Sequence, residues 1–289
     1  MLEIFHVSDL HYGQSNDQNK KAQALLDGIS RQYPFKDCDN RYLLVTGDFT
    51  QGGREDEYKL AMQALMPFKG RVFVTPGNHD YGSIFGADYS EKKARYFDDP
   101  FAKTLEFPHS FINKKVFNCR LNFQSDSLMM IGLNSCAKKG VFDFAQGEIG
   151  DKQIRELDKL LTDADAQIPK LVFLHHIPHK DAAFEFVMTL RDWEELMAVV
   201  NGRIDALAFG HQGKVLDIEQ RGKTGSASAH RPMQVRSLTI PREIDLKRGI
   251  IKHAIVLDAD GSVANQAFYH IKVKNNKLTA TVELANPVG

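Results

Sequence analysis

The amino-acid sequence predicts an α/β fold, and two features of its apolar residues support this prediction. Short, nearly continuous apolar runs recur along the chain, as expected of strands that are buried on both faces. Between them, apolar residues fall at the i, i+3, i+4 and i+7 spacing of amphipathic helices. Alternating strands and helices indicate stacked βα units.

Six apolar runs are expected to form strands. In chain order they are Leu2 to Val7, Tyr42 to Thr46, Val72 to Thr75, Leu128 to Leu133, Leu171 to Leu174 and Ile204 to Phe209.

Three helices are predicted from apolar stripes that we interpret as core-facing surfaces. The stripes are Ala22, Leu25, Leu26 and Ile29, then Tyr58, Ala61, Met62 and Leu65, then Trp193, Leu196, Met197 and Val200. Asp192 and Glu195 have the spacing of a capping box for the last helix, and Asn201-Gly202 supplies a stop signal.

The C-terminal part of the chain has a different pattern of apolar residues. Runs 250–257, 264–273 and 278–284 alternate apolar and polar residues and are separated by DADGS and KNNK, which are hairpin signals, so we expect a β-meander over about 250–284. Residues of about 81–123 are irregular and rich in aromatic side chains. We interpret them as an elaboration packed on the domain, with a lid over the site as the alternative. The whole chain, 1–289, is expected to form one domain with its functional core in 1–213.

Composition excludes several functional classes. The 37 basic and 37 acidic residues cancel, which disfavours long nucleic acid as a partner. Three widely spaced cysteines fit neither a disulfide framework nor a zinc cage. No apolar run approaches the ~18 residues of a membrane span, and the start MLEIFHVSDLH becomes polar too early for a signal peptide. We therefore expect a cytoplasmic protein without a membrane partner.

Side chains that bind metals follow five of the predicted strands. They are Asp9 and His11, Asp48, Asn78, His175 beside His176, and His211. Loops that leave the carboxyl ends of neighbouring strands converge on one crevice of an α/β sheet, so these residues are expected to meet there. Taken alone, Asn78 and Asp80 after Pro-Gly would be ordinary turn residues.

The donor types favour a catalytic transition-metal centre. Asp9 and His11 are two apart, so an extended segment places both on one side. Asp48 has enough lone pairs to bridge two cations. Oxygen and nitrogen donors without thiolate suit manganese, iron or zinc, and two ions about 3.5–4 Å apart would explain the number of ligands.

The successive motifs DLH, GDFT, GNHD, HHIP and GHQG resemble those of the calcineurin-like metallophosphoesterase superfamily over Met1 to Gly213. The resemblance implies a four-layer α/β/β/α sandwich with two central mixed β-sheets, a dinuclear metal centre and phosphoester hydrolysis. It assigns one ion to Asp9, His11 and Asp48, and the other to Asp48, Asn78, His175 and His211.

The same resemblance matches His79 to the catalytic histidine of the family. An imidazole beside the ligand Asn78 is placed to protonate the alkoxide that a phosphodiester expels, and Asp80 would orient His79 or a ligand. The expected reaction is in-line attack of hydroxide on phosphorus, with the charge stabilised by two divalent or trivalent ions of Mn, Fe or Zn.

The sequence departs from the family pattern at one position. The last motif of the family is usually GHxH, and Gly213 stands where its second histidine would be. Three alternatives are open for the first metal site: water takes the vacant position, another donor such as Gln212 or His230 binds there, or the site is only weakly occupied. We favour His175 over His176 as ligand, and we interpret His6 as an ordinary core histidine.

These inferences predict a metal-dependent phosphodiesterase that acts on a small nucleotide or a related phosphodiester. A phosphomonoesterase, or a non-catalytic binding or scaffold protein on the same fold, are the alternatives.

Overall fold

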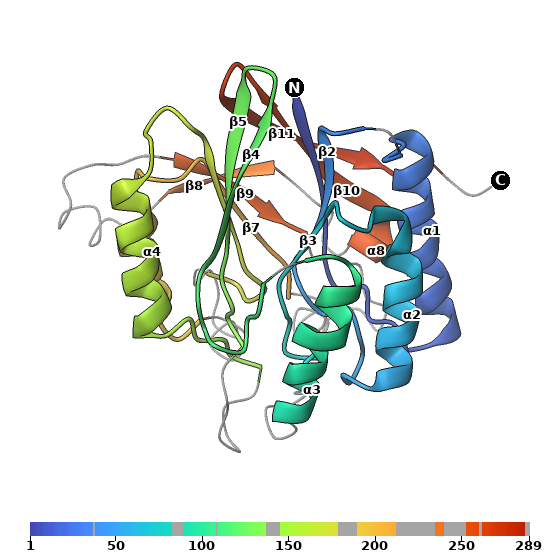
Figure 1. The fold of residues 1–289 in the computed structure, drawn as a ribbon. Helices are drawn as coiled ribbons and strands as arrows, with labels where there is room; N and C mark the ends of the chain where they lie inside the picture. The colour runs from blue at the N-terminus through green and yellow to red at the C-terminus, as the bar shows by residue number, and fades with distance from the viewer. Residues whose placement is uncertain are drawn as a thin grey trace, which may run out of the picture.

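The computed structural model describes residues 1–36, 38–82, 89–107, 109–136, 145–178, 190–211, 235–239, 253–259 and 262–286. Within these residues two β-sheets lie face to face, and helices cover the outer faces (Figure 1). The predicted fold class, a four-layer α/β/β/α sandwich with two mixed sheets, is confirmed.

The first sheet has the strand order β11-β10-β1-β2-β3. Its strands are β1 (Leu2–Val7), β2 (Arg41–Val45), β3 (Val72–Val74), β10 (Ala267–Lys274) and β11 (Lys277–Leu284). β1, β2 and β3 run parallel, whereas β10 is antiparallel to β1 and β11 to β10. The carboxyl ends of β1, β2 and β3 therefore lie at one edge of this sheet.

The second sheet has the order β4-β5-β6-β7-β9-β8. Its strands are β4 (Phe117–Phe123), β5 (Asp126–Gly132), β6 (Lys170–Phe173), β7 (Ala206–Phe209), β8 (Val235–Thr239) and β9 (His253–Asp258). β5, β6, β7 and β9 are parallel, and the antiparallel strands β4 and β8 form the two edges. The six strands predicted upstream of residue 213 all form, with small differences at their ends.

Helices α1 (Asn16–Gln32) and α2 (Glu55–Leu65) cover the first sheet, and α4 (Asp151–Asp163) lies on the second (Figure 1). Helix α5 (Trp193–Val200) packs beside α4 in the core of the second sheet. The three predicted helices are α1, α2 and α5. The short helical segments are η1 (Met66–Phe68), α3 (Glu91–Tyr96), η2 (Phe97–Ala102) and α8 (Ser262–Asn265).

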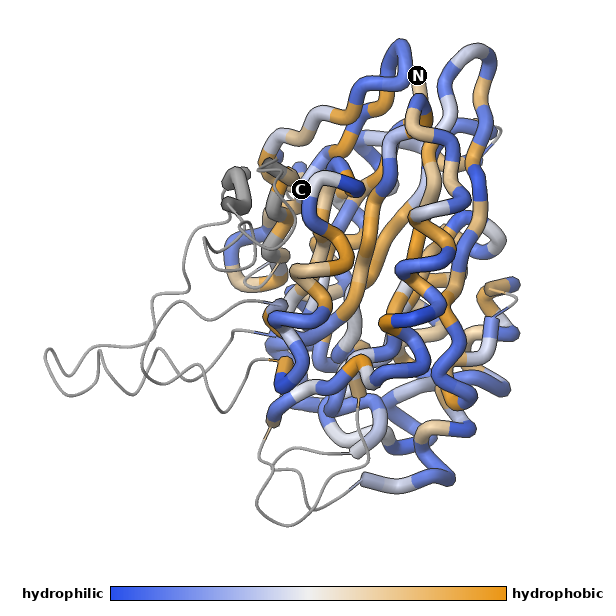
Figure 2. The backbone as a smooth tube through the Cα atoms, turned by 90° about the vertical axis from the view of Figure 1, so that its left-hand side faces the viewer, coloured by the Kyte–Doolittle hydropathy of each residue, from blue (hydrophilic) through white to orange (hydrophobic). Residues whose placement is uncertain are grey.

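Two apolar cores hold the layers together. The larger core includes residues of α1, α2 and both sheets, and the smaller core fills the space between the second sheet and α4 with α5. Figure 2 shows apolar strands running through the middle of the molecule, with hydrophilic stretches on the helices outside them.

The predicted capping box of α5 differs from the structure. The carboxylate of Asp192 accepts hydrogen bonds from the backbone N–H groups of Ile149 (3.1 Å) and Gly150 (2.6 Å). Asp192 therefore accepts from backbone N–H groups at the start of α4 instead of capping α5. The local spacing to Glu195 does not reveal these partners. Asn201 follows the last residue of α5, as predicted.

The tail is not the predicted meander. β9 joins the second sheet beside β7, the chain then crosses through α8, and β10 with β11 form a hairpin in the first sheet. Of the two predicted hairpin signals, KNNK joins β10 and β11 in a hairpin, with Asn275 and Asn276 at φ 53° and 54°. The alternating pattern identified strands correctly but did not determine which sheet each strand joins. That the whole chain forms one domain stays a prediction.

The aromatic segment contributes to the core. Phe97, Phe101 and Phe111 are fully buried, and Phe101 lies 4.9 Å from Phe49 and 5.1 Å from Tyr58, measured between ring centroids. The segment therefore supports the GDFT loop that contains Phe49, and its last part is the edge strand β4. Phe85 lies outside the described residues, and the alternative of a lid formed by the segment of about 81–123 stays untested.

Candidate metal centre

The predicted donors lie at the carboxyl ends of parallel strands of both sheets. Asp9 and His11 follow β1, Asp48 follows β2, and Asn78 follows β3. His175 follows β6 and His211 follows β7 in the second sheet. Hydrogen bonds join the sheets here: among them, the His211 N–H donates to Asp9 Oδ2 (3.1 Å), and His175 Nδ1 donates to the Thr46 carbonyl (2.7 Å). Residues scattered over two hundred positions thus reach one place.

The backbone at these strand ends is strained. Four donors adopt left-handed conformations that are uncommon for residues other than glycine: Asp9 (φ 59°), His11 (φ 48°), Asp48 (φ 52°) and His211 (φ 77°). Each such residue costs on the order of 1 kcal/mol or more, and such strain concentrates at functional sites. The clustering of this strain on the predicted ligands is independent of their side-chain chemistry.

Asp48, Asn78, His175 and His211 form the more buried half of the site. His175 Nε2 lies 2.9 Å from His211 Nδ1, 3.3 Å from Asn78 Oδ1 and 3.4 Å from Asp48 Oδ2. All four residues are at most 4% exposed. Asp48, His175 and His211 form a group whose ligand atoms can hold a metal ion.

The hydrogen bonds of the two histidines fix which nitrogen faces the group. A carbonyl can only accept, so His175 Nδ1 donates to Thr46 O, and His211 Nε2 donates to Ala145 O (2.9 Å). In the neutral rings the facing atoms, His175 Nε2 and His211 Nδ1, therefore carry lone pairs. Metal-binding histidines typically donate their other ring N–H to a carbonyl in this way.

Two lone pairs at 2.9 Å repel each other unless a proton or a metal ion lies between them. Ligands that are about 2.1 Å from one ion and at right angles lie about 3.0 Å apart, so the spacing fits a metal ion. The donor set of two imidazoles, a carboxylate and an amide oxygen fits a transition metal as well. The residues present therefore fit the metal that the sequence motifs implied.

His11, Asp48 and His79 form the second group that can hold an ion. Asp48 Oδ2 lies 3.8 Å from His11 Nε2 and 4.0 Å from His79 Nε2, and Asp9 Oδ1 lies 3.8 Å from His11 Nε2. The Asp48 Oδ1 atom accepts the backbone N–H of His79 (3.0 Å), which turns Oδ2 toward both groups. Asp48 is thus the carboxylate that the two groups share.

His79 is held from its far side. Its Nδ1 donates to the Gln51 carbonyl (2.7 Å), so Nε2 is the nitrogen that faces Asp48. The side chains of His79 and His11 are 15% and 18% exposed, whereas that of His175 is fully buried. The His11 and His79 side of the site is therefore its solvent-accessible side.

Asp80 connects two loops of the site. Its Oδ1 accepts hydrogen bonds from the backbone N–H and the hydroxyl of Thr50, each 3.0 Å, and its Oδ2 accepts the Gly77 N–H (2.9 Å). Burial and the nearby Asp48 charge raise the pKa of Asp80 to about 7. These contacts place Asp80 as a support of the loops, while Gln51 orients the ring of His79.

The electrostatics of the buried group are those of a cation site. Burial alone would raise the pKa of Asp48, but the charges of His175 and His79 outweigh it and hold this pKa well below its usual range. Burial lowers the pKa of His175, yet the Asp48 charge raises it to about 9. In the metal-free protein a proton thus neutralises the group.

His176 has a different role from His175. Its Nδ1 lies 2.8 Å from Ser135 Oγ, which also accepts the backbone N–H groups of His175 (3.3 Å) and His176 (3.1 Å). With both lone pairs used, the hydroxyl donates to His176 Nδ1. Four residues that support the site had no role predicted from the sequence: Ser135, Gln51, Thr46 and Thr50. A polar residue after a predicted strand was a signal for Ser135.

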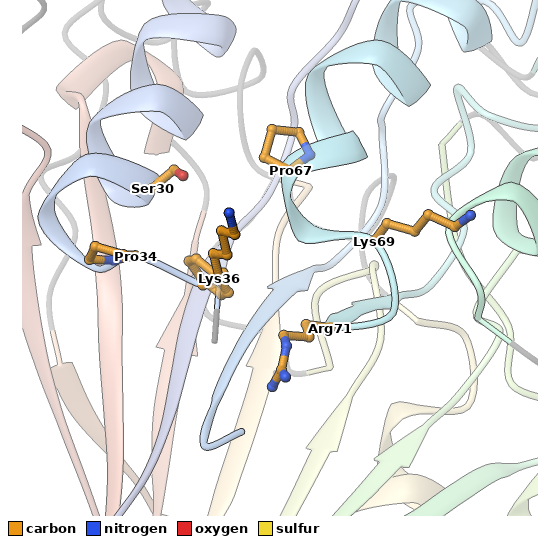
Figure 3. A pocket seen from close by; sticks show the side chains of 7 residues that line it. Ser30, Pro34, Lys36, Pro67, Lys69 and Arg71 are labelled. Carbon is orange, nitrogen blue, oxygen red and sulfur yellow. The ribbon is translucent and has the colours of Figure 1, made fainter. Parts of the chain in front are cut away.

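Other predicted features lie elsewhere. Gly213, Gln212 and His230 lie outside the described residues, so the question of the missing GHxH histidine stays open. A recess of about 480 Å³ is lined by Ser30, Lys36, Lys69 and Arg71, among others, near the amino end of β3. Lys69 and Arg71 extend away from Lys36 and pair with Glu106 and Asp39 (Figure 3). This recess is thus remote from the predicted metal donors. The charged groups of Lys36, Lys69 and Arg71 do not converge on one position in it.

A two-sheet α/β sandwich with shared carboxylate and imidazole donors at its strand ends is the architecture of a metal-dependent phosphoesterase. The chain belongs to the calcineurin-like phosphoesterase family, whose sequence pattern matches residues 2–214.

Curated relatives are distant. The glycerophosphodiester phosphodiesterase of Enterobacter lignolyticus is 26% identical over 61% of this chain and 56% of that protein. A probable cyclic nucleotide phosphodiesterase of Vesicomyosocius okutanii is 24% identical over 76% of this chain and 82% of that protein. The chain thus spans little more than half the length of the first of these relatives.

Among solved structures, a purple acid phosphatase from yellow lupin (Lupinus luteus) seeds is similar in fold. It superposes with a TM-score of 0.61 at 12% identity, covering 98% of this chain and 51% of the phosphatase. This likeness supports the fold.

Proposed function

We propose that this protein is a metal-dependent phosphodiesterase with a dinuclear centre. The observation that carries the proposal is the facing pair of lone-pair nitrogens, His175 Nε2 and His211 Nδ1, together with the shared carboxylate of Asp48. One ion would be held by Asp48, Asn78, His175 and His211. The other would be held by Asp9, His11 and Asp48, on the solvent-accessible side.

The metal ions, when bound, would supply a nucleophile at neutral pH and stabilise negative charge on the phosphoryl oxygens. Manganese, iron or zinc suits the mixed oxygen and nitrogen donors. The protein keeps the donors in place through strained strand ends and through the carbonyls of Thr46 and Ala145, which set the tautomers of His175 and His211.

His79 is the proposed proton donor to the leaving group. Gln51 O holds its Nδ1 proton, so Nε2 is the atom free to face a substrate oxygen from the accessible side. Donation from Nε2 requires the doubly protonated ring and leaves a neutral imidazole that is still bonded to Gln51. Asp80 holds the GNHD loop against Thr50, and this contact fixes the position of His79.

The proposed substrate is a small phosphodiester, such as a nucleotide or a related compound. The names of the two distant relatives, one for glycerophosphodiesters and one for cyclic nucleotides, support a diester of small size. The zero net charge supports the exclusion of long nucleic acid.

A cytoplasmic location is part of the proposal. The three cysteines, Cys38, Cys119 and Cys136, are free thiols, which suits a reducing compartment. Within the described part of the chain, none of the helices combines the length and apolar character that a membrane crossing needs.

The test uses the full chain, stripped of metal and reloaded with Mn²⁺, Fe²⁺ or Zn²⁺. We expect faster hydrolysis of an aryl phosphodiester than of an aryl phosphomonoester, and a screen of cyclic nucleotides and glycerophosphodiesters would then narrow the substrate. His79→Asn should lower kcat by about 10²–10⁴-fold while metal content stays the same. His109→Asn, at a histidine packed among Phe107, Phe111 and Phe117, is the matched control.

Three other outcomes would redirect the proposal. A higher rate on the monoester would favour a phosphomonoesterase. No turnover with any metal would favour a binding or scaffold protein on this fold. Equal losses in the His79 and His109 variants would remove His79 from the chemistry.

A further inference from the structure

His6 is a buried polar residue that the proposed reaction does not use. It is the last but one residue of β1 and is 0% exposed. Phe5 packs on the α1 side of the sheet against Tyr33 and Phe35, so His6, the next residue, lies on the opposite face between the two sheets. Its ring stacks beside Tyr269 at 5.8 Å.

The His6 ring has one hydrogen-bond partner. Nε2 lies 2.9 Å from Thr46 Oγ1, and Nδ1 has no partner within the described residues. Burial lowers the pKa of His6 to about 3, so the ring is neutral. A buried N–H without an acceptor is costlier than a bare lone pair, so the proton resides on Nε2 and is donated to Thr46 Oγ1.

A buried histidine with only one ring nitrogen hydrogen-bonded lowers the free energy of unfolding. A leucine here would bury no unsatisfied nitrogen, just as Ile4, two residues away on the same face, buries none. The residue therefore calls for an explanation beyond filling space, and Thr46 supplies one.

Thr46 is fixed by β1 and in turn fixes His175. Its backbone N–H donates to Val7 O (3.1 Å), and its carbonyl accepts from Ser8 Oγ (2.9 Å) and from His175 Nδ1 (2.7 Å). The next two residues, Gly47 and Asp48, are in left-handed conformations at φ 89° and 52°. A Cβ on Gly47 would lie 2.5 Å from His175 Nδ1, so the imidazole packs directly on this turn.

We propose that His6 is a positioning residue for the metal centre, acting through Thr46. The His6 hydrogen bond fixes the side chain of Thr46, the Thr46 carbonyl then sets the direction of the His175 ring, and Nε2 of that ring faces Asp48 and His211. The inference rests on the proposed function, because it assigns His175 as a ligand. His6 lies outside the ligand set, so it can be changed without removing a donor.

The test compares four single variants and one double variant by Co²⁺ and Mn²⁺ titration and by the visible absorption of the Co²⁺-loaded protein. His6→Met removes the donor, His6→Gln keeps an amide N–H within reach of Thr46, and Thr46→Val removes the acceptor but keeps the carbonyl. Ile4→Val is the matched control, because it alters the same face of β1 and leaves the hydrogen bond intact.

We expect His6→Met and Thr46→Val each to weaken metal binding by about 10-fold and to shift the Co²⁺ spectrum, as loss of an outer-shell partner does. His6→Gln should remain within about threefold of the unmodified chain, and the double variant His6→Met/Thr46→Val should be no weaker than either single one. Thr46→Val also provides the answer if His6→Met does not fold.

Metal binding and spectra in His6→Met or Thr46→Val that match those of Ile4→Val would overturn the inference and leave the proposed function intact. Failure of the unmodified chain to bind either metal would overturn the proposed function together with it. A loss in His6→Gln as large as in His6→Met would mean that ring packing, rather than the hydrogen bond, matters.

Discussion

Gly77→Ala is expected to disable the metal centre through Asp48. Gly77 immediately precedes the proposed ligand Asn78, and a Cβ at this position would lie 2.8 Å from the Asp48 Cγ and closer still to Asp48 Oδ1 and its backbone nitrogen. Ordinary contacts of a Cβ begin near 3.4 Å, so an ordinary contact with Cγ would require a displacement of about 0.6 Å. Metal ligands tolerate displacements of only about 0.5 Å.

The expected magnitude follows from this crowding. Overpacking in a rigid site costs about 1–3 kcal/mol of unfolding free energy, so the variant should still fold. Metal affinity should fall by at least about 10-fold, because Asp48 is the carboxylate that both candidate groups share. Urea unfolding and Mn²⁺ titration, read on the same preparation, separate the two effects.

Gly52→Ala is the matched control for this variant. Its nearest contact would be Glu57 at 3.7 Å, an ordinary van der Waals distance, and it lies in the loop that follows Asp48. It should bind metal as the unmodified chain does. The reasoning would be refuted if Gly77→Ala bound Mn²⁺ as tightly as Gly52→Ala.

The other predictions concern metal linkage, acid stability and the core. Mn²⁺ at about 100 times its Kd should stabilise the folded chain by about 2.7 kcal/mol, seen as a higher Tm that chelator reverses and Asp48→Asn abolishes; an unchanged Tm would mean no specific site. Hydrogen bonding to His270 outweighs burial and, with Arg41, lowers the pKa of Glu3 from 4.5 to about 2. The unfolded chain therefore binds more protons below about pH 4.5, so urea unfolding should show this contribution, about 3 kcal/mol, lost between pH 5 and 2, and Glu3→Gln should flatten that loss. Phe101→Ala should cost about 3–5 kcal/mol because Phe101 is fully buried against Phe49 and Tyr58, whereas Leu60→Ala on the exposed side of α2 should cost under about 0.5 kcal/mol in the same assay.

The sequence was most informative where one local pattern determines one local structure. Buried strands such as β1 and β6 are apolar throughout, and the amphipathic spacing of α1 marks its core face directly. The meeting of the metal donors could also be predicted, because the carboxyl ends of parallel strands share one edge of a sheet. The strand β4 and the helix α4 were not predicted, although their sequences have strand and helix periodicity in FNCRLNF and in Ile154, Leu157 and Leu161.

Partner choice was beyond the reach of the sequence. The strands β9 and β10 look alike locally but join different sheets, and Asp192 bonds to the start of α4 rather than to its own helix. His175 and His176 are chemically identical and equally buried. Their roles separate only through Thr46 and Ser135, which lie 129 and 41 residues away from them in the chain.

The most direct measurement is anomalous diffraction at the manganese edge from crystals of the full chain grown with Mn²⁺. An anomalous peak within bonding distance of His175 Nε2, His211 Nδ1 and the Asp48 carboxylate is the predicted result, with a second peak beside His11 and Asp9. Full Mn²⁺ loading with no peak at these donors would contradict the assignment of the site.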